Sequence, residues 1–258
     1  MVLTVNIGNT HISVGGYHGR EKLFSGRLSA RPGMTADECA IALGQLLDLH
    51  GHGGCRWEGA ILGSVAPALT APMTAALRRR SDGRVLTVGP GLKSGLAICI
   101  DDPGQLGAEL LCAGVAALDL APGPVILLCA DTALSLMGID EKGRLLGGMI
   151  LPGPKAALNA LVKGTAQLPQ VDLDAPRAAL APLAKNSADC LQAGSILGTA
   201  AMLDGLIARL RGELGENAWV AATGELPEAV LKAMAQPVRR CEDLILDGMN
   251  LIWLKNQK

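Results

Sequence analysis

The chain has 258 residues, which is enough for one large domain or two smaller ones with an ample core. Its 23 basic and 24 acidic side chains leave a net charge of −1, so no basic field favours a nucleic acid as partner. Apolar residues make up 49% of the chain, but they include only three tryptophans, one tyrosine and one phenylalanine. Alanine, leucine and glycine are therefore expected to build a core in which helices and sheets pack closely.

The sequence also argues against a membrane or secreted protein. The longest uncharged helical run, residues 190–203, is shorter than the roughly 20 apolar residues that a membrane span needs. The N-terminus begins with a predicted strand and not with a basic segment followed by an apolar one, so no signal peptide is expected. Seven cysteines without a CxxC pair are typical of reduced thiols. We therefore expect a cytoplasmic protein with no membrane partner and no nucleic-acid partner.

Residues 2–16 predict a β-hairpin. Apolar residues alternate along two short runs on either side of a small polar turn, Gly8-Asn9-Thr10. Backbone N–H groups in such a turn point the same way and can cradle an anion such as phosphate. An ordinary N-terminal hairpin gives the same pattern, so this motif alone leaves both interpretations open.

Strands and helices alternate from this hairpin to residue 121. The pattern predicts a third strand over residues 22–28, then a helix (34–49), a strand (58–65), a helix (70–80) and a strand (84–88). A glycine-rich loop over residues 89–96 and a final helix over residues 105–120 follow. The glycine-rich loop can line a ligand pocket or simply connect two elements. His50, His52 and Cys55 lie among three glycines, which favours a flexible loop over a metal site.

Residues 124–139 repeat the layout of the first hairpin, with Asp131 and Thr132 in the turn. Residues 129–133 of this copy align with residues 6–10 of the first. Two similar hairpins half a chain apart indicate a duplicated domain, with an N-terminal half over residues 1–121 and a C-terminal half over residues 122–258. A nucleotide held between the two hairpins is a plausible use of such a duplication.

The remainder of the second half is predicted to be mostly helical. A strand over residues 144–151 ends in glycines that allow either a close approach to a bound group or a sharp bend. Ser187 is expected to cap a long helix that runs to about Arg211. A strand over residues 219–222 and helices from about Pro227 and Leu246 complete the chain.

Seven short motifs, taken in order, resemble those of the type III pantothenate kinases, a family of the actin and sugar-kinase superfamily. Each motif is weak alone, but their order and spacing cover nearly the whole chain. They occupy residues 6–10, 64–67, 89–96, 107–110, 129–133, 147–153 and 165–169. The resemblance implies an α/β fold of duplicated actin-like, ribonuclease H-like domains, each with a mixed five-stranded sheet flanked by helices.

The resemblance also implies an activity and a set of site residues. The activity is ATP-dependent phosphorylation of pantothenate, the first step toward coenzyme A, by a homodimer that uses ATP with Mg²⁺ and a monovalent cation. Glu109 falls at the position of the catalytic base, and Asn6 at that of a carboxylate that holds the metal. The other implied contacts are to phosphate (Gly8, Asn9, Thr10, Asp131, Thr132, Ala133), to pantothenate or a related small molecule (Gly107, Leu110, Ser187) and to the monovalent cation (Cys129, Asp131).

Several charged positions of the family pattern are substituted here. Asn6 and Cys129 replace aspartates, Asp131 replaces a glycine, Leu110 replaces an arginine, and Glu109 replaces an aspartate with a longer carboxylate. Removing charge partners from a phosphoryl-transfer site typically lowers the rate by orders of magnitude. The sequence therefore predicts a pseudokinase, a catalytically impaired or inactive paralogue that binds a ligand or partner and binds Mg·ATP weakly; ATP with Mg²⁺ and a monovalent cation are expected as cofactors only if it is active. The alternatives are an active pantothenate kinase with a rearranged cation site, and a sister enzyme that acts on another small substrate.

Overall fold

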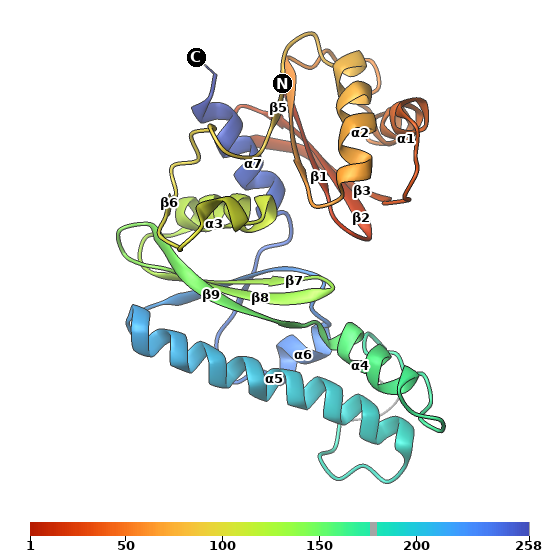
Figure 1. Ribbon diagram of the computed structural model, residues 1–258, viewed down its shortest axis with the longest axis vertical. Helices are drawn as coiled ribbons and strands as arrows, with labels where there is room; N and C mark the ends of the chain where they lie inside the picture. Colours follow the sequence, from red (N-terminus) through yellow and green to blue (C-terminus); the bar gives the residue numbers. More distant parts are fainter. Residues whose placement is uncertain (176–179, 258) are drawn as a thin grey trace. The chain divides into compact units, whose positions relative to one another are not determined.

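The computed structural model describes residues 1–175 and 180–257, and the chain folds into two compact units (Figure 1). The first unit contains Met1–Leu96, Asp101–Leu120 and Asp243–Lys258, and the second contains Ala97–Ile100 and Ala121–Glu242. Each unit has a mixed sheet of its own with helices packed on it, which confirms the expected fold class. The assignment of separate functional halves at residues 1–121 and 122–258 stays a prediction.

The first sheet is built around the N-terminal hairpin. Its strand order is β3-β2-β1-β4-β5, from β1 (Val2–Ile7), β2 (His11–His18), β3 (Glu21–Ser29), β4 (Gly59–Ser64) and β5 (Val85–Thr87). Every residue of β1 is buried, and the strand pairs antiparallel with β2 and parallel with β4. A strand buried on both faces is usually a continuous apolar run. Thr4 and Asn6 are the polar exceptions in β1, and Asn6 lies one residue before its end.

Two helices, α1 (Ala36–Leu49) and α2 (Pro67–Arg80), pack against one another in this unit (Figure 1). α1 begins with a capping box, in which Thr35 and Glu38 each accept a backbone N–H from the other. α2 has no side-chain cap and begins at a proline, whose missing N–H is not needed in a first turn. It therefore starts about three residues earlier than expected from the sequence.

The helices α3 (Ala108–Leu120) and α7 (Leu244–Lys255) approach each other closely in the first unit. A Cβ atom on Gly248 would lie 1.8 Å from the carbonyl oxygen of Cys112, so only glycine permits this approach. α7 also contacts β1. The C-terminal helix thus packs with the first half of the chain, because its buried apolar residues cover α3 and the first sheet.

The helix expected over residues 105–120 is divided in two. A short 3₁₀ turn, Pro103–Gln105, precedes α3 and is separated from it by Leu106 and Gly107. The Asp102 side chain accepts the Gly104 N–H and caps the start of this turn, and the Leu106 N–H donates to the Pro103 carbonyl at its end.

The second sheet repeats the topology of the first. Its order is β11-β10-β7-β8-β9-β6, from β6 (Ala97–Ile98), β7 (Val125–Ala130), β8 (Ala133–Ile139), β9 (Arg144–Pro152), β10 (Trp219–Gly224) and β11 (Arg239–Arg240). Strands β9-β8-β7-β10-β11 match β3-β2-β1-β4-β5 in order and in every parallel or antiparallel pairing. This correspondence confirms the duplication inferred from the two hairpins. The two-residue strand β6 adds a sixth strand beside β9 and is too short to show an alternating pattern.

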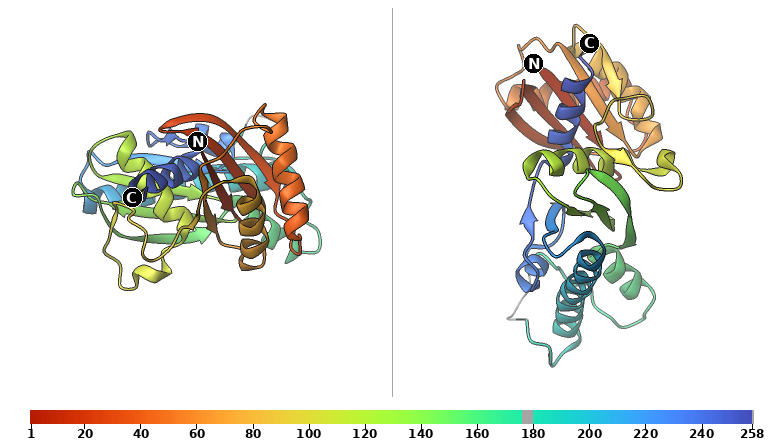
Figure 2. Two further views of the ribbon diagram at one scale, coloured as in Figure 1. Left: turned by 90° about the horizontal axis from the view of Figure 1, so that it is seen from above. Right: turned by 90° about the vertical axis from the view of Figure 1, so that its left-hand side faces the viewer.

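Three helices belong to the second unit: α4 (Pro154–Lys163), α5 (Ser187–Leu214) and α6 (Glu228–Ala233). α5 is a long, straight helix beside the sheet (Figure 2) and contacts β7 and β8. Its buried face repeats every three or four residues, as expected of a helix packed on a sheet: Ile196, Ala200, Leu203 and Ile207. The cap of α5 is Asn186, whose side chain accepts the Asp189 N–H, so the expected cap at Ser187 is wrong by one residue.

The 28 residues of α5 also correct the membrane argument made from the sequence. By length and composition alone this helix could cross a membrane, because it continues past the charged residue that ends the uncharged run. In the most apolar 18-residue stretch of this helix, 39% is buried inside the protein. A core helix of this kind passes the same test, so the finding is weak support for a membrane span.

Candidate functional site

The turn of the first hairpin presents the residues expected to hold phosphate. The Gly8 N–H donates to the His11 carbonyl at 2.9 Å, which leaves Asn9 and Thr10 at an exposed tip. The Ala30 N–H donates to the Thr10 carbonyl, also at 2.9 Å. Backbone hydrogen bonds to the first residue of β2 and to the residue after β3 therefore hold this turn in place.

Behind the turn, Asn6 meets Glu109. The Asn6 Nδ2 atom donates a 2.8 Å hydrogen bond to Glu109 Oε1, although the residues are 103 positions apart. Asn6 is 6% exposed, and its Oδ1 is buried and accepts no hydrogen bond from any described residue. A Cβ atom on Gly8 would lie 3.5 Å from Glu109 Oε1. The structure thus brings the two expected catalytic residues together beside the predicted phosphate turn.

The start of α3 carries the remaining residues of this group. Glu109 lies in the first turn of the helix, and the Gly107 carbonyl accepts the Leu111 N–H at 3.1 Å. Leu110 is half-buried and brings no positive charge. Burial raises the pKa of the Cys112 thiol well above its usual range, and the negative charge of Glu109 raises it further. The thiol therefore stays protonated and is no nucleophile at neutral pH.

In the second unit, Cys129 occupies the position that Asn6 has in the first. It lies one residue before the end of the central strand β7 and pairs with Ser135 of β8 and Thr223 of β10. These neighbours correspond to β2 and β4 of the first sheet. The alignment of residues 129–133 with residues 6–10 is therefore confirmed, because each segment has the equivalent place in the sheet of its own unit.

The turn of the second hairpin is held by close backbone contacts. The Asp131 N–H donates to the Ala133 carbonyl, and the Gly153 N–H donates to the Thr132 carbonyl, each at 2.9 Å. A Cβ atom on Gly153 would lie 2.6 Å from the Asp131 carbonyl oxygen. Gly153, the N-cap of α4, approaches the backbone of this turn so closely that no larger residue fits.

A second glycine approaches the same hairpin from β10. Gly224 has a φ of +89°, and a Cβ atom there would lie 1.9 Å from the Ala130 carbonyl oxygen. The Glu225 N–H donates to that carbonyl at 2.6 Å. Backbone after β9 thus contacts the turn, and backbone at the end of β10 contacts the last residue of β7, while the Asp131 and Thr132 side chains remain exposed at the tip.

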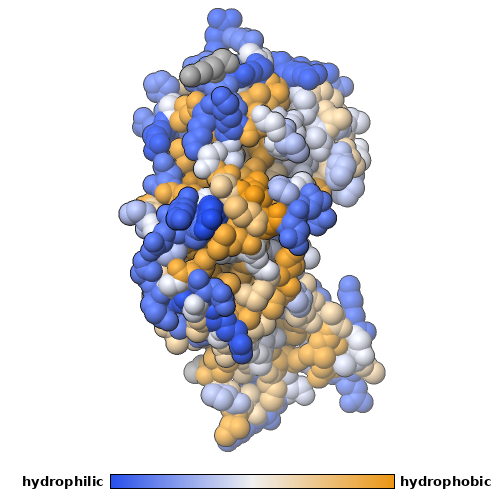
Figure 3. Space-filling model, turned by 60° about the vertical axis from the view of Figure 1, so that its left-hand side comes forward, coloured by the Kyte–Doolittle hydropathy of each residue, from blue (hydrophilic) through white to orange (hydrophobic). Residues whose placement is uncertain are grey.

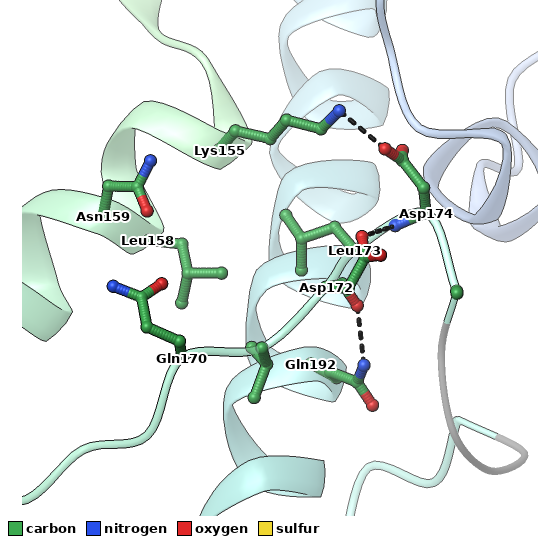
Figure 4. A pocket seen from close by; sticks show the side chains of 10 residues that line it. Lys155, Leu158, Asn159, Gln170, Asp172, Leu173, Asp174 and Gln192 are labelled. Carbon is green, nitrogen blue, oxygen red and sulfur yellow. Dashed lines mark hydrogen bonds and ion pairs between the residues drawn. The ribbon is translucent and has the colours of Figure 1, made fainter.

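A cavity of about 530 Å³ lies beside α4 in the second unit (Figure 4). Leu158, Val171 and Leu173 give it apolar walls. Above them, Lys155 Nζ and Asp174 Oδ2 form a 2.6 Å ion pair, and this hydrogen bond raises the pKa of Lys155. The remaining polar lining comes from Asn159, Gln170, Asp172 and Gln192, and the Gln192 Nε2 donates to the Asp172 carbonyl at 2.6 Å.

The sequence of this chain matches the model of one protein family. Residues 2–209 match the model for "Type III pantothenate kinase". Relatives described as type III pantothenate kinases agree with the chain over its whole length. The protein from Moorella thermoacetica is 34% identical over 261 residues, which cover 99% of this chain and 100% of the relative. The one from Frankia alni is 35% identical over 256 residues, with the same coverage.

The chain belongs to the type III pantothenate kinase family. The resemblance seen in the seven motifs is therefore confirmed. Solved structures with much lower identity share the fold alone. The ethanolamine utilization protein EutJ from Carboxydothermus hydrogenoformans has a TM-score of 0.56 at 10% identity, covering 97% of this chain and 89% of that one. A ROK family protein from Streptococcus pneumoniae TIGR4 has a TM-score of 0.51 at 13% identity, covering 99% and 98%.

A kinase of this family uses ATP with a divalent cation, and the donor groups of this chain can be compared with that need. The first unit offers the Glu109 carboxylate and the buried Asn6 Oδ1. Within the described residues no group of three or more His, Cys, Asp or Glu side chains could hold a metal ion. Mg²⁺ commonly binds one or two carboxylates together with phosphate oxygens. The donor set therefore fits an ion that arrives with ATP and does not fit a resident one; Cys129 and Asp131 stay predicted ligands of a monovalent cation.

Some features of this family member could not be found from the sequence. The contact between Asn6 and Glu109 joins a strand to a helix far along the chain, and no local pattern indicates it. The cavity beside α4 depends on how a loop folds over that helix. The rings of His50 and His52, in the segment expected to be a flexible loop, stack on Phe24 with centroids 4.9 and 5.2 Å away. Phe24 lies far from both histidines in the sequence, so no local pattern indicates this packing.

Proposed function

We propose that this chain is an ATP-dependent pantothenate kinase with a rearranged site, which catalyses the first step toward coenzyme A. The observation that carries the proposal is the contact between Asn6 and Glu109, because it holds a carboxylate beside the turn expected to bind phosphate. Full-length agreement with relatives described as pantothenate kinases supports the active form over the impaired paralogue favoured by the sequence.

The chemistry follows from this arrangement. Glu109 accepts the proton of the pantothenate hydroxyl, the hydroxyl oxygen forms a bond to the γ-phosphorus, and the bond from that phosphorus to the β,γ-bridging oxygen breaks to release ADP. Backbone N–H groups of Asn9 and Thr10 in the first turn and of Thr132 in the second bind phosphate oxygens, since the N–H groups of Gly8 and Asp131 already donate to His11 and Ala133. Gly107 and Leu110 of the first unit and Ser187 of the second are the predicted contacts to pantothenate, and Cys129 and Asp131 would hold the monovalent cation.

A second candidate function is the catalytically impaired paralogue that binds a ligand without turnover. It is favoured by Leu110 and Asp131, since the first takes the place of a positive charge in the family pattern and the second adds an exposed negative charge in a turn predicted to bind phosphate. Both candidates bind pantothenate or a related small molecule, and they differ in turnover.

Pantothenate-dependent release of ADP by the purified chain tests the proposal. With saturating Mg·ATP and K⁺ we expect a turnover on the order of 1 per second, as in typical kinases. Glu109→Gln should lower kcat by about 10²- to 10⁴-fold, the usual contribution of a general base. The matched control is Glu141→Gln on an exposed turn, which should leave kcat unchanged. Calorimetric binding of pantothenate without ADP release would instead support the impaired paralogue.

We also propose a homodimer, formed by helices of the second half and by residues 105–120, in the cytoplasm. Apolar side chains that reach the surface support this proposal. Ile150 on β9 is 75% exposed and Leu161 on α4 is 49% exposed, and hydrophobic residues form patches on the face drawn in Figure 3. Sedimentation at micromolar concentration should give a dimer; a monomer alone would contradict it.

A further inference from the structure

Asn6 is an unusual residue for the strand that carries it. It is 6% exposed in a central strand that is buried along its whole length. Its Oδ1 accepts no hydrogen bond from any described residue, and a Cβ atom on Gly63 of the neighbouring strand would lie 3.3 Å from it. An amide oxygen buried in this way is unfavourable. An apolar residue would stabilise this strand better, so we look to the other polar atom of Asn6, the Nδ2 donor, for its role.

That other end is a donor aimed at a carboxylate. The Nδ2 atom lies 2.8 Å from Glu109 Oε1. An ionised carboxylate only accepts hydrogen bonds, so the contact fixes which end of the amide faces Glu109. Hydrogen bonds to an ionised group are about twice as strong as those between neutral groups. The contact therefore holds the carboxylate at one place behind the hairpin turn.

We infer that Asn6 is a positioning residue for Glu109, and that positions 6 and 109 work as a matched amide–carboxylate pair. This inference rests on the proposed function for its kinetic consequences. Glu109 reaches Asn6 from the first turn of α3, and an aspartate there would be one carbon shorter and would fall short of the amide. The donor of Asn6 is therefore used only if residue 109 has the length of a glutamate, and the carboxylate of Glu109 is held only if residue 6 has a donor.

The pair predicts an effect opposite to that of a metal-anchoring position. If residue 6 served to hold a cation, Asn6→Asp would restore a charge and raise activity. In this structure Asn6→Asp places two carboxylates at hydrogen-bond distance, so they repel and one must take up a proton or move away. Glu109 then loses its position or its capacity to accept the substrate proton.

A double-mutant cycle separates the two outcomes. We expect Asn6→Ala, Asn6→Asp and Glu109→Asp each to lower kcat by about 10- to 100-fold, with a smaller change in the KM for pantothenate. The combination N6D/E109D should be faster than N6D alone by about tenfold, because the shorter aspartate relieves the repulsion. The matched control is Gln45→Glu on the exposed face of α1, the same amide-to-carboxylate change away from the pair, which should leave kcat unchanged.

Two kinetic results would overturn the inference. One is a rise in kcat with Asn6→Asp alone. The other is a cycle in which the effects of N6D and E109D simply multiply, since independent sites show no coupling. Asn6→Ala introduces no charge and keeps the test usable if N6D does not fold.

Thermal unfolding of the same variants without substrate tests the contact apart from the reaction. We expect Asn6→Asp to lower Tm by about 2–4 °C relative to the Gln45→Glu control, and N6D/E109D to recover part of that loss. If the wild-type chain has no turnover, the proposed function fails and this unfolding cycle still decides whether the pair is coupled. If the wild type turns over normally and Asn6→Ala changes neither kcat nor Tm, the positioning role alone is wrong.

Discussion

Tyr17 and Asp247 join the N-terminal hairpin to the C-terminal helix, through a 2.7 Å hydrogen bond from the tyrosine hydroxyl to Asp247 Oδ1. The two residues are 230 positions apart, and Tyr17 is 1% exposed. Burial raises the pKa of the Tyr17 hydroxyl far above its usual range, and the hydrogen bond that this hydroxyl donates to Asp247, together with the negative charges of Asp247 and Asp243, raises the pKa further. This contact is one physical reason why α7 folds with the first unit.

The first prediction is that Tyr17 stays protonated in the folded protein at alkaline pH. Its pKa is raised on folding, so the stability it contributes is fully present below about pH 10, where unfolded tyrosine ionises, and is lost as the pH rises further. Since the chain has one tyrosine, tyrosinate absorbance should appear together with the loss of helical circular dichroism. The Tyr17→Phe variant is the control, because it has no tyrosine and should show no tyrosinate absorbance. Tyrosinate that forms near pH 10 in the folded protein would contradict the buried hydrogen bond.

The second prediction compares two helix glycines of opposite effect. A Cβ atom on Gly248 would lie 1.8 Å from a backbone oxygen of α3, whereas one on Gly205 of α5 meets no atom within 4 Å. Gly248→Ala should lower the free energy of unfolding by about 1–3 kcal/mol through overpacking. Gly205→Ala should raise it by about 0.5–1 kcal/mol, because alanine favours a helix. Urea unfolding measures both, and equal effects of the two changes would contradict the close approach of α3 and α7.

Much of the fold could be predicted from the sequence because its signals are local. Alternating apolar residues indicated both hairpins, and the first turn of α1 contains the acidic residues expected there. The partner of an apolar helix face is not a local signal. For this reason the sequence could not indicate that α7 packs on α3, nor that β6 and β11, each two residues long, extend the second sheet.

The third prediction concerns the turn at Asp131 and Thr132. A Cβ atom on Gly153 would lie 2.6 and 2.7 Å from the two carbonyl oxygens of that turn. Gly153→Ala should therefore displace the turn and weaken the binding of Mg·ATP by about tenfold or more. The control is Gly198→Ala on the exposed side of α5, where a Cβ atom meets nothing within 4 Å. Calorimetry with Mg·ATP compares them, and equal affinity in both variants would show that this turn does not bind the nucleotide.

The candidate site could be predicted only in part. The motifs named Asn6 and Glu109, and the structure brings them into contact. From the sequence, Asn6 indicated a lost metal ligand and hence an impaired enzyme. Its hydrogen bond to Glu109 instead gives the amide a use in the site, and that use depends on a tertiary contact that no spacing along the chain reveals.

The central claim is that this chain transfers a phosphoryl group to pantothenate. The most direct measurement is a mass-spectrometric time course of pantothenate incubated with Mg·ATP, K⁺ and the purified wild-type chain, with Glu109→Gln in parallel. We expect the wild type to convert pantothenate to a product heavier by one phosphoryl group, with one ADP formed for each product, and Glu109→Gln to form it far more slowly. Unchanged pantothenate after a long incubation, with the ligand shown to bind, would contradict the claim.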